Sequence, residues 1–250
     1  MNINPLYALP NFFTAGSIFC GMVSIMFAAN SSFGYAAWLI VLSMIFDGLD
    51  GRVARLTNTA SKFGIEFDSL ADVVAFGAAP AMLVYFYIPT IGSNYGFEGD
   101  YGLYRIFACA LFVIFGAIRL ARFNITTSNA EPNNFIGLPI PSAAVIIVFW
   151  VLLDLKYGVF AASFSYVLLI LTFLVSVLMV SNIRYPSFKK IKWNLKIFVA
   201  LLIALAIIIS SKYYVEFFCA AFSVYVLYGI VRWLCLMTKV LWKGGRKEAK

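Results

Sequence analysis

Four aspartates, Asp47, Asp50, Asp68 and Asp72, lie in one short stretch of the sequence, DGLDGRVARLTNTASKFGIEFDSLAD. The sequence on both sides of this stretch is strongly apolar. A charged side chain at bilayer depth costs a few kcal/mol unless it is paired, hydrated or bound to a metal. Four carboxylates so close together would repel one another without cations between them. The pattern therefore predicts a cation-binding site, and we expect the chemistry of the protein to occur there.

The spacing of these aspartates indicates how they would be arranged. Asp47 and Asp50 are three residues apart and Asp68 and Asp72 are four apart, so on helices each pair shares one face. Two such faces could hold one or two divalent cations, and a metal pair stabilises the attacking and leaving oxygens of a phosphoryl-type displacement. The sequence contains no histidine. Carboxylates must then supply both the metal ligands and the general base, which favours Mg²⁺ or Mn²⁺.

Small residues and one arginine accompany the aspartates. Gly48, Gly51 and Ala54 would keep the first helix thin, and Gly64 would do the same near the start of the second. A large ligand could then approach the helix backbones closely. Arg55 could bind a phosphate through two parallel hydrogen bonds. Taken singly, small residues in membrane helices more often serve close packing.

The composition identifies the class of protein. Hydrophobic residues make up 63% of the 250 residues, charged residues only 12%, and the mean hydropathy is +0.92. Soluble domains have about 45–50% apolar and about 25% charged residues. The chain is therefore expected to be an integral membrane protein, and its formal charge of +8 is interpreted as a membrane-surface feature.

Apolar runs long enough to cross a bilayer, about 20 residues each, predict the fold. We expect an all-α polytopic membrane protein with about eight transmembrane helices in a single domain, residues 1–250. A short interfacial segment, Met1–Pro10, would precede the first helix, and no cleavable signal is evident. The predicted helices begin near Asn11, Phe33, Asp68, Leu103, Leu138, Ala161, Leu195 and Tyr213. The acidic stretch would then join the second and third helices at one membrane face.

The basic residues predict the orientation of the chain. All but three of the 19 basic residues fall in the loops on the side of the acidic stretch or in the tail at residues 239–250. The three exceptions are Arg105, Lys156 and Lys212. Because short cytoplasmic loops carry an excess of Lys and Arg, we expect both termini and the acidic stretch to face the cytoplasm. A bacterial or archaeal cell membrane is the expected location.

The acidic stretch resembles, at every position, the signature of the CDP-alcohol phosphatidyltransferases: Asp47-x2-Asp50-Gly51-x2-Ala54-Arg55-x8-Gly64-x3-Asp68-x3-Asp72. This resemblance implies a six-helix core, here with two additional helices, usually in a homodimer. It also implies a reaction in which an alcohol hydroxyl attacks the β-phosphorus of a CDP-linked lipid and CMP leaves.

The resemblance further implies roles for individual residues. Two divalent ions, Mg²⁺ or Mn²⁺, would be held by Asp47, Asp50 and Asp68, with Asp72 completing the site. Asp72 would also act as the general base on the acceptor hydroxyl. The cytidine diphosphate part of the substrate would be held by Gly51, Ala54, Arg55 and Gly64.

Three further segments, Leu9–Thr14, Arg119–Asn124 and Phe135–Ser142, resemble the phosphatidylserine synthase branch of this family. That branch implies CDP-diacylglycerol and L-serine as substrates. Arg119 and Arg122 would lie at the depth of the metal site, where either could pair with the serine carboxylate or act as a topology anchor. Asn124 is a further candidate for acceptor binding.

Two other functions remain open from the residues. Glycerol 3-phosphate or an inositol phosphate could replace serine as acceptor, with Arg119 and Arg122 supplying part of the required basic cluster. A divalent-cation transporter could also use four aspartates. A transporter would, however, be expected to spread polar residues along a path through several spans, whereas here the acidic cluster is confined to one membrane face.

Overall fold

The computed structural model describes residues 8–94, 102–127, 134–159, 165–186, 208 and 210–248. Within these residues, six helices are long and apolar enough to cross a membrane, and a seventh apolar helix is shorter. The predicted all-α polytopic architecture is confirmed. In chain order the helices are α1 (Ala8–Ala29), α2 (Phe33–Leu56), α3 (Lys62–Asp72), the π-helical segment η2 (Val73–Ala78), α4 (Ala79–Asn94), α5 (Gly102–Thr127), α6 (Ile140–Tyr157), α7 (Ser165–Val180) and α9 (Tyr214–Glu248).

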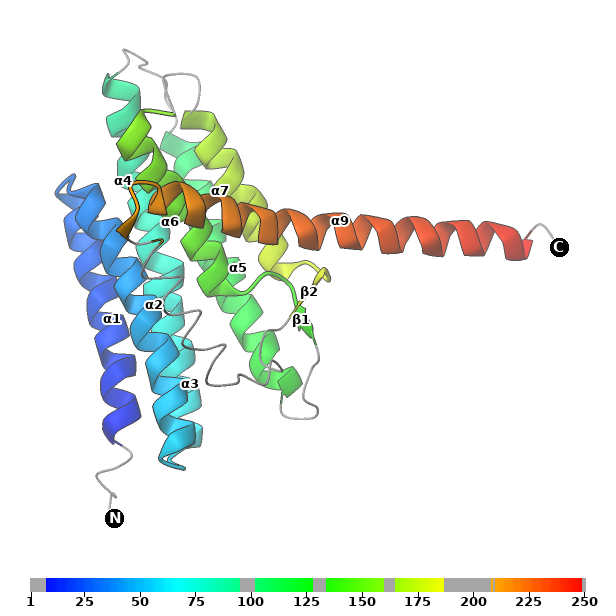
Figure 1. Ribbon diagram of the computed structural model, residues 1–250, viewed down its shortest axis with the longest axis horizontal. Coiled ribbons are helices and arrows are strands. Elements are labelled where there is room, and N and C mark those ends of the chain that lie inside the picture. The colour runs from blue at the N-terminus through cyan, green and yellow to red at the C-terminus, as the bar shows by residue number, and fades with distance from the viewer. Residues whose placement is uncertain are drawn as a thin grey trace.

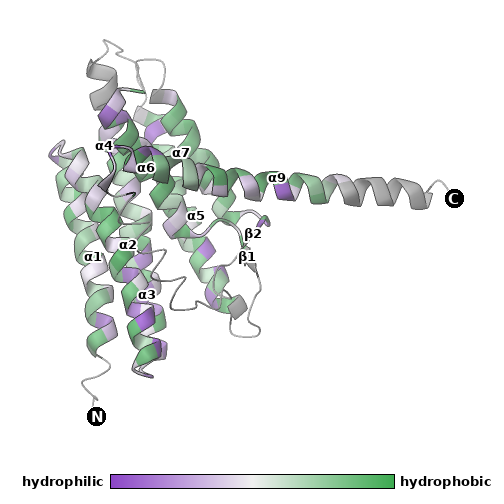
Figure 2. Ribbon diagram, viewed as in Figure 1, coloured by the Kyte–Doolittle hydropathy of each residue, from purple (hydrophilic) through white to green (hydrophobic). Residues whose placement is uncertain are grey.

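Helices α1 to α7 stand side by side as a bundle, and α9 crosses them and extends away from the bundle (Figure 1). Hydrophobic residues cover most of each helix, while hydrophilic residues gather on α3 and toward the last turns of α5 (Figure 2). Below α9 and beside α5 lies a feature that the sequence did not predict, a two-stranded antiparallel ribbon (Figure 1). It pairs β1 (Asn134–Ile136) with β2 (Arg184–Pro186) and places Phe135 opposite Tyr185.

Seven of the eight predicted apolar runs are helices in the described residues, and the run predicted from Leu195 starts in a part that lies outside them. The predicted interfacial segment Met1–Pro10 needs a correction, because α1 already begins at Ala8. Pro10 is compatible with this start, since the first N–H groups of a helix have no partner within it. Residues 1–7 lie outside the described part of the chain.

Hydroxyl groups and small residues hold α1 against α2. The Oγ atoms of Ser17 and Ser43 lie 2.7 Å apart, and Ser43 Oγ also donates to the Ser17 carbonyl at 3.1 Å. Nearer the turn that joins α1 to α2, Ser24 Oγ donates a hydrogen bond to the Ala36 carbonyl at 2.8 Å. Small side chains let membrane helices approach closely enough for such bonds. This pairing keeps the last turns of α2 beside the first turns of α1, where the acidic residues begin.

A close backbone contact joins α1 to the π-helical segment η2. A Cβ atom added at Gly21 would lie 2.8 Å from the Cα of Ala75, so this helix pair requires a glycine here. Segment η2 begins directly after Asp72, in one continuous helix with α3 and α4. π-helical turns are rare and often occur at functional sites. The contact with α1 therefore fixes the position of the helix turn that carries Asp72.

Helix α6 lies at the centre of the bundle, and most of its residues are buried. Pro139 occupies its N-cap position, and Gly137, just before it, has a φ of +80°. A side chain at Gly137 would overlap the Met179 carbonyl. At the other end, a salt bridge of 2.7 Å between Lys156 and Glu216 attaches α6 to the start of α9.

Candidate active site

Three carboxylates converge where α2 meets α3. Helix α2 contributes Asp47 and Asp50, α3 contributes Asp68, and one oxygen of each lies within 4.8 Å of the others. Asp50 is buried, whereas Asp47 and Asp68 are half-buried. Carboxylate oxygens are the ligands that Mg²⁺ and Mn²⁺ prefer, and three negative groups at this separation need a cation to offset their repulsion. The arrangement of these residues fits a divalent metal site.

Asp72 follows Asp68 by one helical turn and is buried. Its carboxyl group interacts with those of Asp47 and Asp68 and with the guanidinium group of Arg119 on α5. The structure thus brings all four aspartates of the acidic stretch into one cluster, with Arg119 beside it. The roles of these aspartates as metal ligands, and of Asp72 as general base, stay predictions.

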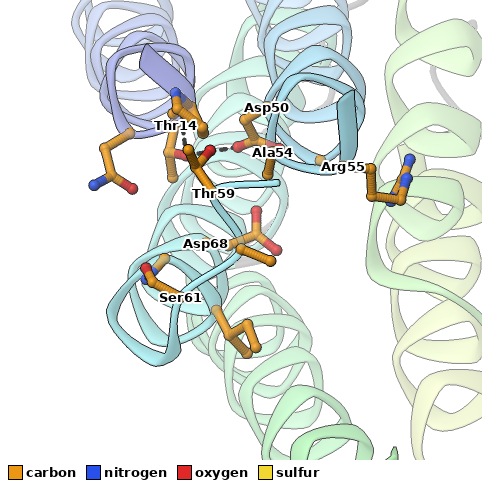
Figure 3. Close-up of a pocket in the computed structure, with 13 residues that line it drawn as sticks. Thr14, Asp50, Ala54, Arg55, Thr59, Ser61 and Asp68 are labelled. Carbon is orange, nitrogen blue, oxygen red and sulfur yellow. Dashed lines mark hydrogen bonds between the residues drawn. The ribbon is translucent and has the colours of Figure 1, made fainter. Parts of the chain in front are cut away.

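A pocket of about 610 Å³, including its open mouth, lies beside this cluster. Asp50 and Asp68 project into the pocket from α2 and α3, and Arg55 extends at its side (Figure 3). The pocket is lined by Pro10, Asn11, Thr14, Asp50, Gly51, Ala54, Arg55, Thr59, Ala60, Ser61, Gly64, Ile65 and Asp68. All four residues predicted to hold the cytidine diphosphate are among them.

The two pocket glycines are not explained by helix packing. Among the described residues, a Cβ atom at Gly51 would meet only the flexible Arg55 side chain, at 3.5 Å. One at Gly64 would lie 3.3 Å from Ser61 Oγ and 3.6 Å from Asn11 Oδ1. This differs from Gly21, which touches a neighbouring backbone. The missing side chains instead leave room in the pocket, which favours the prediction that a ligand approaches the helix backbones there.

The loop between α2 and α3 is held by its own polar side chains. Thr57 Oγ1 donates to the Val53 carbonyl at 2.8 Å and lies 2.6 Å from Thr59 Oγ1. Thr59 is buried, although it lies between two helices. Ser61 is the N-cap of α3, and its Oγ accepts a hydrogen bond from the Gly64 N–H at 3.0 Å. The sequence favoured a solvated loop here and left nucleotide contacts by Thr59 and Ser61 as the alternative, and in the structure both residues line the pocket.

Thr14 orients one of the carboxylates. Its Oγ1 lies 2.7 Å from Asp50 Oδ2, to which it donates, and 3.2 Å from the Pro10 carbonyl. Because Thr14 is also buried, this bond restricts the side-chain conformations open to Asp50. From the sequence, Thr14 was a polar residue at a helix end for which capping was equally likely, and its bond to Asp50 was not predicted because the two residues are far apart in the chain. The only signal was its position at the end of the Leu9–Thr14 segment.

The three residues predicted to bind the acceptor differ in their surroundings. Arg119 is buried, and its guanidinium group interacts electrostatically with Asp72. Arg122 donates to the carbonyls of Val180, Ile136 and Ser181, at 3.1, 3.0 and 3.3 Å. Asn124 Nδ2 donates to Ser69 Oγ at 2.9 Å. Arg122 therefore ties α5 to α7 and β1, and these contacts favour Arg119 as the partner of an acceptor carboxylate.

Comparison with known proteins decides between the classes of function left open above. The family model of the CDP-alcohol phosphatidyltransferases matches residues 7–178. The chain belongs to this family. A divalent-cation transporter is thereby disfavoured, and the resemblance of the acidic stretch is confirmed. Both the family and the apolar helices indicate a membrane protein, so the chain is an integral membrane protein.

Curated relatives extend the similarity to nearly the whole chain. A CDP-diacylglycerol–serine O-phosphatidyltransferase of Helicobacter pylori (strain ATCC 700392 / 26695) is 55% identical over 96% of this chain and 97% of its own length. A protein of the same name from Methanocaldococcus jannaschii is 35% identical over 93% and 98%. The archaetidylserine synthase of Methanothermobacter thermautotrophicus is 37% identical over 74% and 72%.

Proposed function

We propose that this chain makes phosphatidylserine by transferring the phosphatidyl group of CDP-diacylglycerol to the hydroxyl of L-serine, with release of CMP. The convergence of Asp47, Asp50 and Asp68 beside a pocket that contains Gly51 and Gly64 carries the proposal. Serine as the acceptor is supported by the names of relatives that cover nearly the whole chain.

Asp47, Asp50 and Asp68, together with Asp72, would hold one or two divalent cations, Mg²⁺ or Mn²⁺. When bound, such ions neutralise the pyrophosphate and stabilise the charge that develops during displacement. Thr14 holds Asp50 in place for this task. The cluster sits at the end of two helices, so that a nucleotide can enter from water while the lipid chains stay in the bilayer.

The pocket residues would bind the nucleotide part of the substrate. Gly51, Ala54 and Gly64 leave the helix backbones open to a diphosphate. Arg55, exposed at the side of the pocket, can donate two parallel hydrogen bonds to a phosphate oxygen pair. We place the diacylglycerol chains among the apolar helix surfaces beside the pocket.

Asp72 would accept the proton of the serine hydroxyl. The hydroxyl oxygen forms a bond to the β-phosphorus of CDP-diacylglycerol, the bond from that phosphorus to the bridging oxygen breaks, and CMP leaves with the bridging oxygen. Asp72 is suited to this role because it is buried and because its carboxyl group interacts with Asp47, Asp68 and the guanidinium group of Arg119. A positioned general base contributes typically about 10²–10⁴-fold to a rate.

The positive-inside rule supports a cytoplasmic orientation of the active site and of both termini. We further propose that the protein resides in a bacterial or archaeal cell membrane and that it forms a homodimer. The basic tail at residues 239–250 would lie at the cytoplasmic lipid surface.

The acceptor can be tested with purified protein and CDP-diacylglycerol, offered L-serine, glycerol 3-phosphate or an inositol phosphate in parallel reactions. We expect CMP release to depend on serine and to yield phosphatidylserine, as measured by chromatography of both products. CMP release that depends on one of the phosphorylated alcohols instead would show that the acceptor is wrong while the family chemistry is right.

A further inference from the structure

Among the residues that the structure describes, the largest fully buried side chain is a tyrosine of the ribbon. Tyr185 on β2 is 0% exposed. Across the residues that the structure describes, its hydroxyl group has no hydrogen-bond partner. Leaving a buried hydroxyl without a hydrogen-bond partner is energetically unfavourable, and such groups in native proteins call for an explanation. A bound ligand that accepts a hydrogen bond from the Tyr185 hydroxyl would explain why the hydroxyl has no partner in the protein.

Tyr185 is linked to the active site through a second tyrosine. Its ring centroid lies 5.4 Å from that of Tyr225 on α9. The Tyr225 phenol in turn interacts electrostatically with the guanidinium group of Arg119, which interacts with Asp72. Neither tyrosine lines the pocket proposed for the nucleotide. The two tyrosines and Arg119 therefore form a connected series of aromatic and charged side chains outside that pocket.

The fold holds Tyr185 in this position from two directions. A side chain at Gly229 of α9 would overlap the Tyr185 ring, so the ring lies directly against the helix backbone. The ribbon fixes the other side, because Tyr185 pairs with Phe135 and the neighbouring Ile136 carbonyl accepts a hydrogen bond from Arg122. The site thus combines α5, β2 and α9, and the last two lie beyond residue 178, where the match to the family model ends.

We propose that Tyr185, together with Arg119, binds the carboxylate of the acceptor serine, and that α9 closes this acceptor site through Tyr225 and Gly229. The inference rests on the proposed function. A guanidinium group only donates hydrogen bonds, and a phenol is a good donor, so the pair selects an anionic group. The carboxylate is the anionic group of serine, and hydrogen bonds to charged groups are stronger and more directional than neutral ones.

The test compares Tyr185→Phe with Tyr228→Phe, a control on α9 whose side chain is 52% exposed. The first variant keeps the ring and its packing and removes only the hydroxyl. Losing a hydrogen bond to a charged group, about 1.5–3 kcal/mol, should raise the KM for serine about tenfold or more. The KM for CDP-diacylglycerol should stay unchanged, as should both constants of Tyr228→Phe.

L-serinamide, in which a neutral amide replaces the carboxylate, separates carboxylate binding from a structural role. As a competitive inhibitor against serine, it should bind the wild type and Tyr185→Phe equally well. Two results would show that Tyr185 does not bind the carboxylate and that the inference is wrong. In one, Tyr185→Phe weakens the binding of serine and of serinamide by the same factor; in the other, it leaves the KM for serine unchanged.

Gly229→Ala provides an independent variant, because its methyl group displaces the Tyr185 ring without altering the phenol. Gly34→Ala is the matched control, since an added Cβ there meets no atom of the described residues within 4 Å. We expect Gly229→Ala to raise the KM for serine selectively, and an unchanged KM would contradict the role of α9. A wild-type protein without serine-dependent CMP release would instead overturn the proposed function itself.

Discussion

Each aspartate of the site has a different set of neighbours. Asp50 accepts a hydrogen bond from Thr14, whereas Asp72 interacts electrostatically with Arg119. The residue types and spacing predicted that the aspartates would converge, because positions three and four apart share a helix face. The sequence placed Arg119 at the depth of the metal site as a candidate for the acceptor carboxylate. It did not predict that Thr14 of α1 bonds Asp50, or that Asp72 is the aspartate that interacts with Arg119. Contacts between residues far apart in the chain depend on helix packing, which a local pattern does not contain.

The variant Asp72→Asn tests whether the side chain of Asp72 acts as the general base. The amide keeps the size of the side chain but accepts no proton, so we expect the kcat for CMP release to fall about 10²–10⁴-fold. Binding of the CDP-lipid, measured by equilibrium dialysis, should be largely retained. Glu66→Gln is the matched control, since Glu66 is exposed on α3. An Asp72→Asn enzyme with near-normal turnover would refute the role of Asp72 as base.

The acidic site depends on how a few elements meet. Two apolar runs joined by a polar connection predicted a helix–loop–helix at the acidic site. In the structure, α2 and α3 form this helix–loop–helix. The π-helical turns of η2 were not predicted, because the run from Val73 to Ala78 looks like ordinary apolar helix. Nor was the β1–β2 ribbon, whose two strands have three residues each and lie far apart in the sequence. Such short pieces carry too little periodicity to be recognised.

Gly21→Ala tests the contact that positions η2. The added methyl group would press on the Ala75 backbone, and overpacking of this kind costs typically about 1–3 kcal/mol. We expect a lower unfolding temperature in detergent and a lower kcat, because Asp72 precedes the displaced turn. Gly34→Ala serves as the control. Equal unfolding temperatures and equal activity of the two variants would show that the α1–η2 contact is not needed.

At the scale of the whole molecule, composition and hydropathy were sufficient to identify a polytopic helical membrane protein. The signature Asp47–Asp72 was sufficient to identify the family to which the chain belongs. The course of α9 was not predictable, because an apolar run gives the length of a helix but not the neighbours it crosses. In the structure α9 attaches to α6 through Lys156 and Glu216 and then reaches the ribbon at Gly229. This crossing joins the last part of the chain to the active site.

The proposed function requires that divalent cations bind among the four aspartates and offset the repulsion between their carboxylates. Electron paramagnetic resonance of Mn²⁺, added to protein first dialysed against EDTA, measures this directly. We predict one or two bound ions per chain in the wild type, an affinity at least about tenfold lower in Asp68→Asn, and no change in Glu66→Gln. Equal Mn²⁺ binding by the wild type and Asp68→Asn, or no binding by either, would contradict the claim.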